Sequence, residues 1–302
     1  MSPAMTTDIN SIEWWADNLR GIYEKKLSDR EPIEVWAKVV EHGSGVGEAV
    51  RETNFRNLLL HLGQTLGWTV IFVDRTRNAT TGTWSYLGVP FKKDDWDSLS
   101  HPTISGIGDI PKYHYPRICP HCTLQKCQCA LGDKPDDTER QKQLVWNRNS
   151  TIADTDDTWA KLEDRFQRLF GHDDKIKSYG DIGFHFLEEI GEVSKAIRML
   201  ATSGGMTTKS PAESPTTLTW EGQLVEELAD VLSWSTSVLR RVRLDLENLC
   251  SLCAVNGDPK VLRNNLALAW VMQYTYLNEG KLPVPVCPGC GKKVCKKDCS
   301  EF

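Results

Sequence analysis

Apolar residues recur every three or four positions along most of the chain, which is the period of an amphipathic α-helix. Between residues 74 and 116 this period is lost, and the many turn residues there favour loop or short strands. Helices are predicted over residues 11–26, 32–52, 55–73, 158–170, 184–200, 224–234 and 259–278. We therefore expect an all-α fold with a bundle of helices in each half of the chain.

Two of the predicted helices carry acidic residues on one face. Glu189 and Glu192 lie three positions apart on the first helix, and Glu227 and Asp230 lie three apart on the second. Residues at this spacing share a helix face, so four carboxylates meet if the two helices pack antiparallel. Two like charges about 4 Å apart repel by roughly 4 kcal/mol at an effective dielectric constant of about 20. Such a cluster therefore needs a cation, and a divalent metal ion is expected.

The alternative is a solvated helix face with no ligand. Such a face usually pairs an acidic residue with Lys or Arg four positions later. Here Glu188 is followed at that spacing by Glu192, and Glu226 by Asp230, so like charge meets like charge in both helices. The acidic residues also stand within apolar stretches. Both observations favour a metal site over a solvated face.

The order E-E-x-x-E on one helix and E-x-x-D on the next resembles the signature of the MazG-like nucleotide pyrophosphohydrolases. The residues that match are Glu188, Glu189, Glu192, Glu227 and Asp230, and the likeness extends from about residue 159 to about residue 241. It implies an enzyme that hydrolyses a nucleoside triphosphate, NTP or dNTP, to the monophosphate and pyrophosphate with Mg²⁺. The connection over residues 201–219 is longer than the motif usually has, and it is either a lid or a tolerated insertion.

The resemblance also suggests roles for single residues. Glu189, Glu192, Glu227 and Asp230 would hold one or two Mg²⁺ ions that orient the triphosphate. Glu188 or Glu226 would act as catalytic base, and the sequence does not choose between them. Lys195 is a candidate phosphate contact, and Arg198 and Arg241 are weaker ones. Trp234 either stacks on the nucleotide base or belongs to the core.

The N-terminal half repeats the C-terminal half in part. Residues 61–68 align without gaps onto residues 227–234, and residues 41–51 align likewise onto residues 188–198. In each half, a Cys-Pro-x-Cys sequence follows the aligned segments at nearly the same distance. Chance likeness between amphipathic helices is the alternative. We favour two tandem MazG-like helical bundles, which would form a pseudo-dimer within one chain, because the matching cysteines are independent support.

The two copies differ at the acidic positions. His42, Gly45, His61 and Gln64 stand opposite Glu189, Glu192, Glu227 and Asp230, respectively. The first copy therefore lacks the hard oxygen ligands of Mg²⁺ and is predicted to be inactive. His42 and His61 are either ligands of another metal or, the reading we favour, packing residues.

Eight of the ten cysteines form two compact groups. Each group has the spacing of a structural Zn²⁺ site, with an iron–sulfur cluster as the main alternative and a reactive thiol pair as a lesser one. His114 or His121 could replace a thiolate in the first group. Cys250 and Cys253 are expected to be buried thiols. The two groups are Cys119, Cys122, Cys127 and Cys129, and Cys287, Cys290, Cys295 and Cys299.

Length and charge complete the sequence-based expectations. The 302 residues predict a degenerate repeat over 1–131, a polar linker over 132–157 and a catalytic domain over 158–302. A net charge of −5 does not favour a nucleic-acid partner, although a local basic patch is left open. We expect a cytoplasmic protein without a membrane contact, and a homodimer is left open. The alternative function is a non-hydrolysing nucleotide- or nucleic-acid-binding regulator with structural zinc sites.

Overall fold

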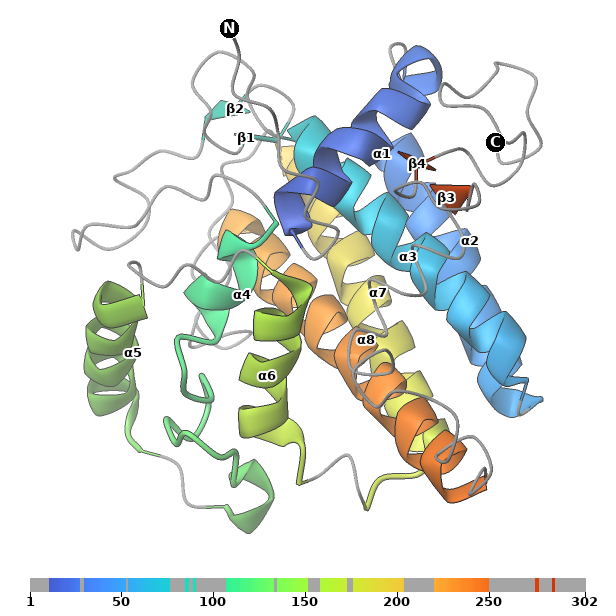
Figure 1. The fold of residues 1–302 in the computed structure, drawn as a ribbon. Helices are drawn as coiled ribbons and strands as arrows, with labels where there is room; N and C mark the ends of the chain where they lie inside the picture. Colours follow the sequence, from blue (N-terminus) through green and yellow to red (C-terminus); the bar gives the residue numbers. More distant parts are fainter. Residues whose placement is uncertain are drawn as a thin grey trace, which may run out of the picture.

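The computed structural model of the protein is predominantly helical, as expected (Figure 1). It describes residues 11–27, 30–52, 54–76, 85–86, 89–90, 107–132, 135–151, 158–172, 176–203, 220–249, 275–276 and 284–285. The helices within these ranges are α1 (Ile12–Leu27), α2 (Pro32–Arg51), α3 (Phe55–Thr76), α4 (Asp109–His114), α5 (Asp137–Thr151), α6 (Trp159–Phe170), α7 (Tyr179–Ser203) and α8 (Trp220–Leu249). A short 3₁₀ turn, η1, covers Cys129–Leu131.

The starts of the helices follow from local sequence. Pro32 occupies the first turn of α2, where its missing N–H costs no hydrogen bond, and Glu31 and Glu34 form a capping box there. Asn54 caps α3 because its Oδ1 accepts a hydrogen bond of 3.2 Å from the N–H of Asn57. Thr158 caps α6 in the same way.

Two helical hairpins form the centre of the molecule. The first consists of α2 and α3, the second of α7 and α8, and α2 packs against α7 (Figure 1). Buried side chains of α1, α2 and α3 form one continuous core with those of α6, α7 and α8. The two predicted domains therefore share a single core.

The helices α2 and α7 cross antiparallel at close range. Gly43 lies against Ile190, and Gly47 lies against Leu187. A Cβ atom added at Gly43 would lie only 2.4 Å from Cδ1 of Ile190, so glycine is what allows this approach. Near one end of the crossing, Nε1 of Trp36 donates a hydrogen bond of 2.8 Å to Oγ of Ser194.

Helix positions in the two halves match the aligned segments. The offset from Ile12 of α1 to Trp159 of α6 equals the offset from Pro32 of α2 to Tyr179 of α7. It also equals the offset at which residues 41–51 align onto residues 188–198. Residues at this same offset meet twice, because Gly43 contacts Ile190 and Ser11 forms an antiparallel bridge with Thr158. Corresponding positions of the two halves therefore lie against each other at these two contacts.

Each half also contains a small antiparallel strand pair. Strand β1 (Ser85–Tyr86) pairs with β2 (Val89–Pro90), and β3 (Thr275–Tyr276) pairs with β4 (Val284–Pro285). In both pairs a tyrosine faces a valine, and a hydroxyl residue faces a proline. The prediction of a helix over residues 259–278 was wrong at β3, since its apolar spacing did not exclude a strand at that end.

Part of the predicted polar linker is helical. Helix α5 lies at the edge of the molecule in Figure 1, and Oδ1 of Asp136 caps it by accepting a hydrogen bond of 3.0 Å from the N–H of Glu139. Leu144 is buried, whereas Trp146 is 75% exposed. The sequence of α5 has too few apolar residues to show a helical period, which is why the helix was not predicted. Among the described helices, none is both long and apolar enough to cross a membrane.

Candidate functional site

Three of the four predicted metal ligands come together between α7 and α8. Carboxylate oxygens of Glu189, Glu227 and Asp230 lie within 4.8 Å of one another. Glu192 is not part of this closest group, but its charge raises the pKa values of the other three acids. The antiparallel hairpin thus produces the predicted acidic cluster, with Glu192 at its margin.

Each of the three carboxylates has a hydrogen-bond donor. Nε1 of Trp234 donates to Oε1 of Glu189 over 3.1 Å, Nε2 of Gln223 donates to Glu227, and the hydroxyl of Tyr115 donates to Asp230. Sequence reasoning missed two of these donors. Gln223 could have been found, since it stands four positions before Glu227 on the same helix. Tyr115 gave no signal because it comes from a distant, aperiodic segment.

Burial makes the acidic cluster hard to ionise without a cation. Glu227 is 4% exposed, and loss of solvation, followed by repulsion from Asp230, raises its pKa far above the usual value. The pKa of Asp230 is also raised well above the usual value, again mainly by burial. Burial raises the pKa of Glu189 to about 7. A bound cation would replace the protons that these acids otherwise retain.

Helix α4 brings a histidine to the same place. Nε2 of His114 lies 3.8 Å from Oδ1 of Asp230 and 4.0 Å from Oε1 of Glu226. His114 and Glu226 are both largely buried, with side chains 5% and 12% exposed. The suggestion that His114 replaces a thiolate in the cysteine cluster was therefore wrong: its Nε2 faces the acids.

The remaining predicted residues lie around this centre. Glu188 is directed to the surface, where its Oε2 lies 3.1 Å from Nδ1 of His185. The ring of His185 stacks on Trp234 at 4.7 Å, and Nζ of Lys177 lies 4.6 Å from the centre of the Trp234 ring. Lys195 is exposed, and its Nζ lies 5.9 Å from the ring of Trp220. Of the two candidate bases, Glu226 is thus the one that lies beside the buried acids.

The equivalent place in the first hairpin holds two histidines, His42 and His61. The rings of His42 and His61 lie 6.3 Å apart. Burial lowers the pKa of His42 to about 4, so its imidazole is uncharged at pH 7. His61 packs on Gly45, where an added Cβ would lie 2.5 Å from its Nδ1. Imidazole thus fills the space beside the position that corresponds to Glu192.

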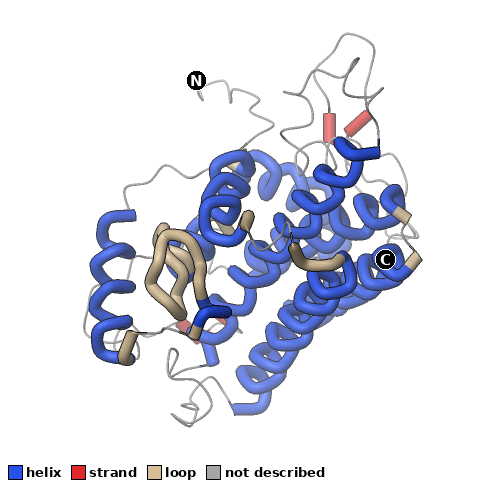
Figure 2. Tube along the Cα trace, turned by 90° about the horizontal axis from the view of Figure 1, so that it is seen from below, coloured by secondary structure: helices blue, strands red, loops and turns tan. Residues whose placement is uncertain are grey.

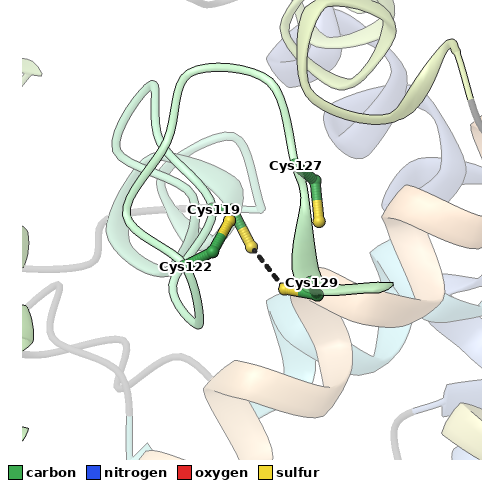
Figure 3. Close-up of side chains that lie close together, drawn as sticks. All are labelled: Cys119, Cys122, Cys127 and Cys129. Atoms are coloured by element: carbon green, nitrogen blue, oxygen red, sulfur yellow. Dashed lines mark hydrogen bonds between the residues drawn. The ribbon is translucent and has the colours of Figure 1, made fainter. Parts of the chain in front are cut away.

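A second candidate site is formed by Cys119, Cys122, Cys127 and Cys129 (Figure 3). Their sulfur atoms lie within 4.8 Å of one another, and the Sγ atoms of Cys119 and Cys129 are 3.6 Å apart. In a tetrahedral zinc site with Zn–S bonds of about 2.3 Å, sulfur atoms are about 3.8 Å apart. The four thiols therefore lie close enough together to bind a metal ion such as Zn²⁺.

The backbone of this cysteine loop is folded tightly around the sulfurs. The N–H of Thr123 donates to the carbonyl of Cys119 over 2.9 Å, and the N–H of Gln128 donates to Sγ of Cys122 over 3.4 Å. Thr123 adopts a left-handed conformation with φ of 58°, which a non-glycine residue adopts only where the surroundings hold it. N–H donors of this kind stabilise thiolates that bind a metal.

The thiols resist losing all their protons together. A hydrogen bond from Cys119 lowers the pKa of Cys127 to about 5, whereas the same bond raises the pKa of Cys119, and burial raises that of Cys129 to about 12. Cys127 therefore forms a thiolate readily, whereas Cys119 and Cys129 need a cation to do so. His121 is exposed. Cys250, Cys253 and the second predicted group, Cys287, Cys290, Cys295 and Cys299, lie outside the described residues, as does most of the long connection before α8.

Comparisons of the chain with models of protein families, with curated proteins and with solved structures found no match.

Proposed function

We propose that the protein is a Mg²⁺-dependent nucleoside triphosphate pyrophosphohydrolase of the MazG-like type, with its active site in the C-terminal half. The observation that carries this proposal is the meeting of Glu189, Glu227 and Asp230 on two adjacent helices. Since no comparison matched, the proposal rests on these residues, on the order of acids along α7 and α8, and on their burial. A buried cluster of three acids is costly for the fold unless it binds a cation.

Mg²⁺ fits the donor set because it prefers carboxylate oxygens, and the cluster supplies three with Glu192 nearby. When bound, it would neutralise the triphosphate and lower the pKa of the attacking water. Glu226 is the better placed acceptor of the proton from that water, since it lies beside Asp230 while Glu188 faces the surface. The reaction consumes one water, breaks the bond between the α- and β-phosphates, and releases the monophosphate and pyrophosphate.

Two further side chains have roles in the proposed site. Trp234 holds Glu189 through its Nε1, and its ring stacks with His185 at the margin of the acids, so that a nucleotide base would extend or replace this stack. Lys195 stands three positions after Glu192, on the same face of α7, and is exposed as a phosphate contact must be. Both assignments follow from position relative to the acids.

The first half serves, in this proposal, as an inactive partner. MazG-like enzymes assemble so that neighbouring subunits complete the nucleotide pocket, and a tandem chain achieves this internally. The tandem arrangement is supported by the equal offsets of the helices in the two halves. It is also supported by the contact of Gly43 with Ile190 and by the bridge between Ser11 and Thr158. Neutral His42, which stands where the second half has Glu189, supports the absence of Mg²⁺ chemistry in the first hairpin.

The decisive experiment measures phosphate release from a panel of NTPs and dNTPs in the presence of pyrophosphatase and Mg²⁺. We expect turnover with at least one nucleotide, and loss of that turnover in Glu227→Gln, which keeps the shape and removes the charge. Glu48→Gln, which changes an exposed acid of α2, is the matched control and is expected to behave as wild type. Nucleotide binding without metal-dependent turnover would overturn the enzyme proposal in favour of a regulator.

A further inference from the structure

Tyr115 connects the acidic site with the cysteine loop. Its hydroxyl donates to Asp230, and its ring stands edge-on to Phe166 and Phe170, both at 5.4 Å. Its carbonyl accepts a hydrogen bond of 3.0 Å from Nη1 of Arg165, which is 2% exposed. Three residues of α6 therefore contact Tyr115, while its hydroxyl reaches Asp230 on α8.

The cysteine loop is attached to the same end of α6. The N–H of Cys127 donates to the carbonyl of Leu169 over 3.0 Å, and Phe170 packs against the cysteine cluster as well as against Tyr115. Figure 2 shows this loop in tan between α5, at the edge, and the other helices. A loop this small has no core of its own, so a metal on its thiols would give it its shape.

The link between Tyr115 and Cys119 is a tight turn. The N–H of Arg117 donates to the carbonyl of Tyr115 over 2.7 Å, and Arg117 has a left-handed φ of 63°. For a residue with a Cβ atom this conformation costs about 1 kcal/mol or more, so it persists only while both ends of the turn are fixed. Asp230 and the α6 contacts fix one end, and the cysteine cluster fixes the other.

We propose that Tyr115 is a positioning residue for the acidic metal site, and that a Zn²⁺ ion in the four-cysteine loop keeps Tyr115 in place. The hydroxyl orients the carboxylate of Asp230, as outer hydrogen-bond partners of metal ligands do, and losing such a partner lowers metal affinity by about 10- to 100-fold. The proposal rests on cation binding by the proposed active site, but not on nucleotide hydrolysis. The cysteine loop would thereby support the metal site between α7 and α8, to which it contributes no ligand.

The first experiment measures Mn²⁺ binding to the full-length, zinc-loaded protein through the spectroscopic signal of free Mn²⁺. Tyr115→Phe keeps the ring between Phe166 and Phe170 and removes only the hydroxyl, so we expect Mn²⁺ affinity to fall about 10-fold or more. Tyr23→Phe, which removes a buried hydroxyl from α1, is the matched control and should bind as wild type. Affinity of Tyr115→Phe within about twofold of wild type would overturn the proposal.

The second experiment tests the link to the cysteine loop. Cys122→Ser should lower the zinc content by one ion per chain and weaken Mn²⁺ binding as Tyr115→Phe does. The double variant should bind no more weakly than Tyr115→Phe alone, because both changes remove one interaction. Effects that multiply would overturn the link. Should Cys122→Ser fail to fold, releasing zinc with a thiol reagent from wild type and Tyr115→Phe supplies the same comparison.

These outcomes separate the two proposals. Mn²⁺ binding that depends on Tyr115, without turnover of any nucleotide, would overturn the enzyme and leave the positioning role. Turnover with Mn²⁺ affinity unchanged in Tyr115→Phe would do the reverse. Failure of Mn²⁺ to bind to wild type would overturn both.

Discussion

The two helical hairpins place different chemistry at corresponding positions. In the α2–α3 hairpin, burial lowers the pKa of His42 and leaves a neutral ring beside His61. In the α7–α8 hairpin, burial raises the pKa values of Glu189 and Glu227 and leaves acids that must hold a proton or a cation. A buried imidazole becomes neutral by losing its proton and needs no ligand. Clustered carboxylates must instead keep their protons or bind a cation. The described acids of the second hairpin are thus a group that a bound cation would stabilise, whereas neutral His42 needs no such ion.

The largest difference between the hairpins should appear in activity. Glu227→Gln should lower kcat/KM for the nucleotide by about 10³-fold or more, since a ligand of the metal loses its charge. His61→Gln, at the corresponding position of α3, should leave kcat/KM within about threefold. Steady-state kinetics at saturating Mg²⁺ measures both. An equal loss in the two variants would show that the hairpins do not differ in function.

Glu189 of the second hairpin should make a contribution to stability that is lost as the pH rises toward neutrality. The pKa of Glu189 is about 7 in the folded chain and about 4.5 in the unfolded one, so the folded state binds the proton more tightly. Raising the pH from 4.5 through 7 without Mg²⁺ should therefore remove the stability that protonated Glu189 contributes, up to about 3 kcal/mol. Urea unfolding of wild type and Glu189→Gln at several pH values measures this, with a smaller loss expected in the variant. Parallel curves would contradict the prediction.

His42 of the first hairpin should make a contribution of the opposite sign over nearly the same pH range. The pKa of His42 is about 4 when folded and about 6.5 when unfolded, so the unfolded state takes up the proton first. The stability that neutral His42 contributes should fall by up to about 3 kcal/mol as the pH drops from 6.5 to 4, and His42→Gln should abolish this contribution. The same unfolding series detects it. A variant that keeps the full acid dependence would exclude His42 as its source.

The smallest effect concerns the crossing of the two hairpins. Gly43→Ala should lower the free energy of unfolding by about 1 kcal/mol, because the new methyl group must displace Ile190 and this outweighs the gain in helix propensity. Gly21→Ala, where nothing lies within 4 Å, should instead raise it by roughly 1 kcal/mol. Chemical denaturation of both variants gives the comparison. Stabilisation by both would mean that the crossing is loosely packed.

Sequence reasoning found what periodicity and spacing encode. The segment predicted as a helix over residues 32–52 is α2, and the acids of α7 and α8 meet because three-residue spacing fixes a helix face. The first cysteine group was equally visible, since its four thiols stand close together in the chain. Each of these features is local in sequence.

What sequence reasoning missed depends on contacts between distant segments. His114 and Tyr115 reach the acids from a stretch without a helical period, and no spacing rule links them to Asp230. Glu192 was expected in the closest group, but helix spacing fixes only the face of a residue and not the reach of its side chain. Helix α5 was missed because its stability comes from a cap and a few buried residues.

The crossing of α2 and α7 brings Gly43 against the residue that stands at its own position in the other half. Such a surface does not distinguish a partner on the same polypeptide from an identical partner on a neighbour. Two molecules that exchange their halves would keep every contact of the crossing, and only the covalent connection favours the intramolecular pairing.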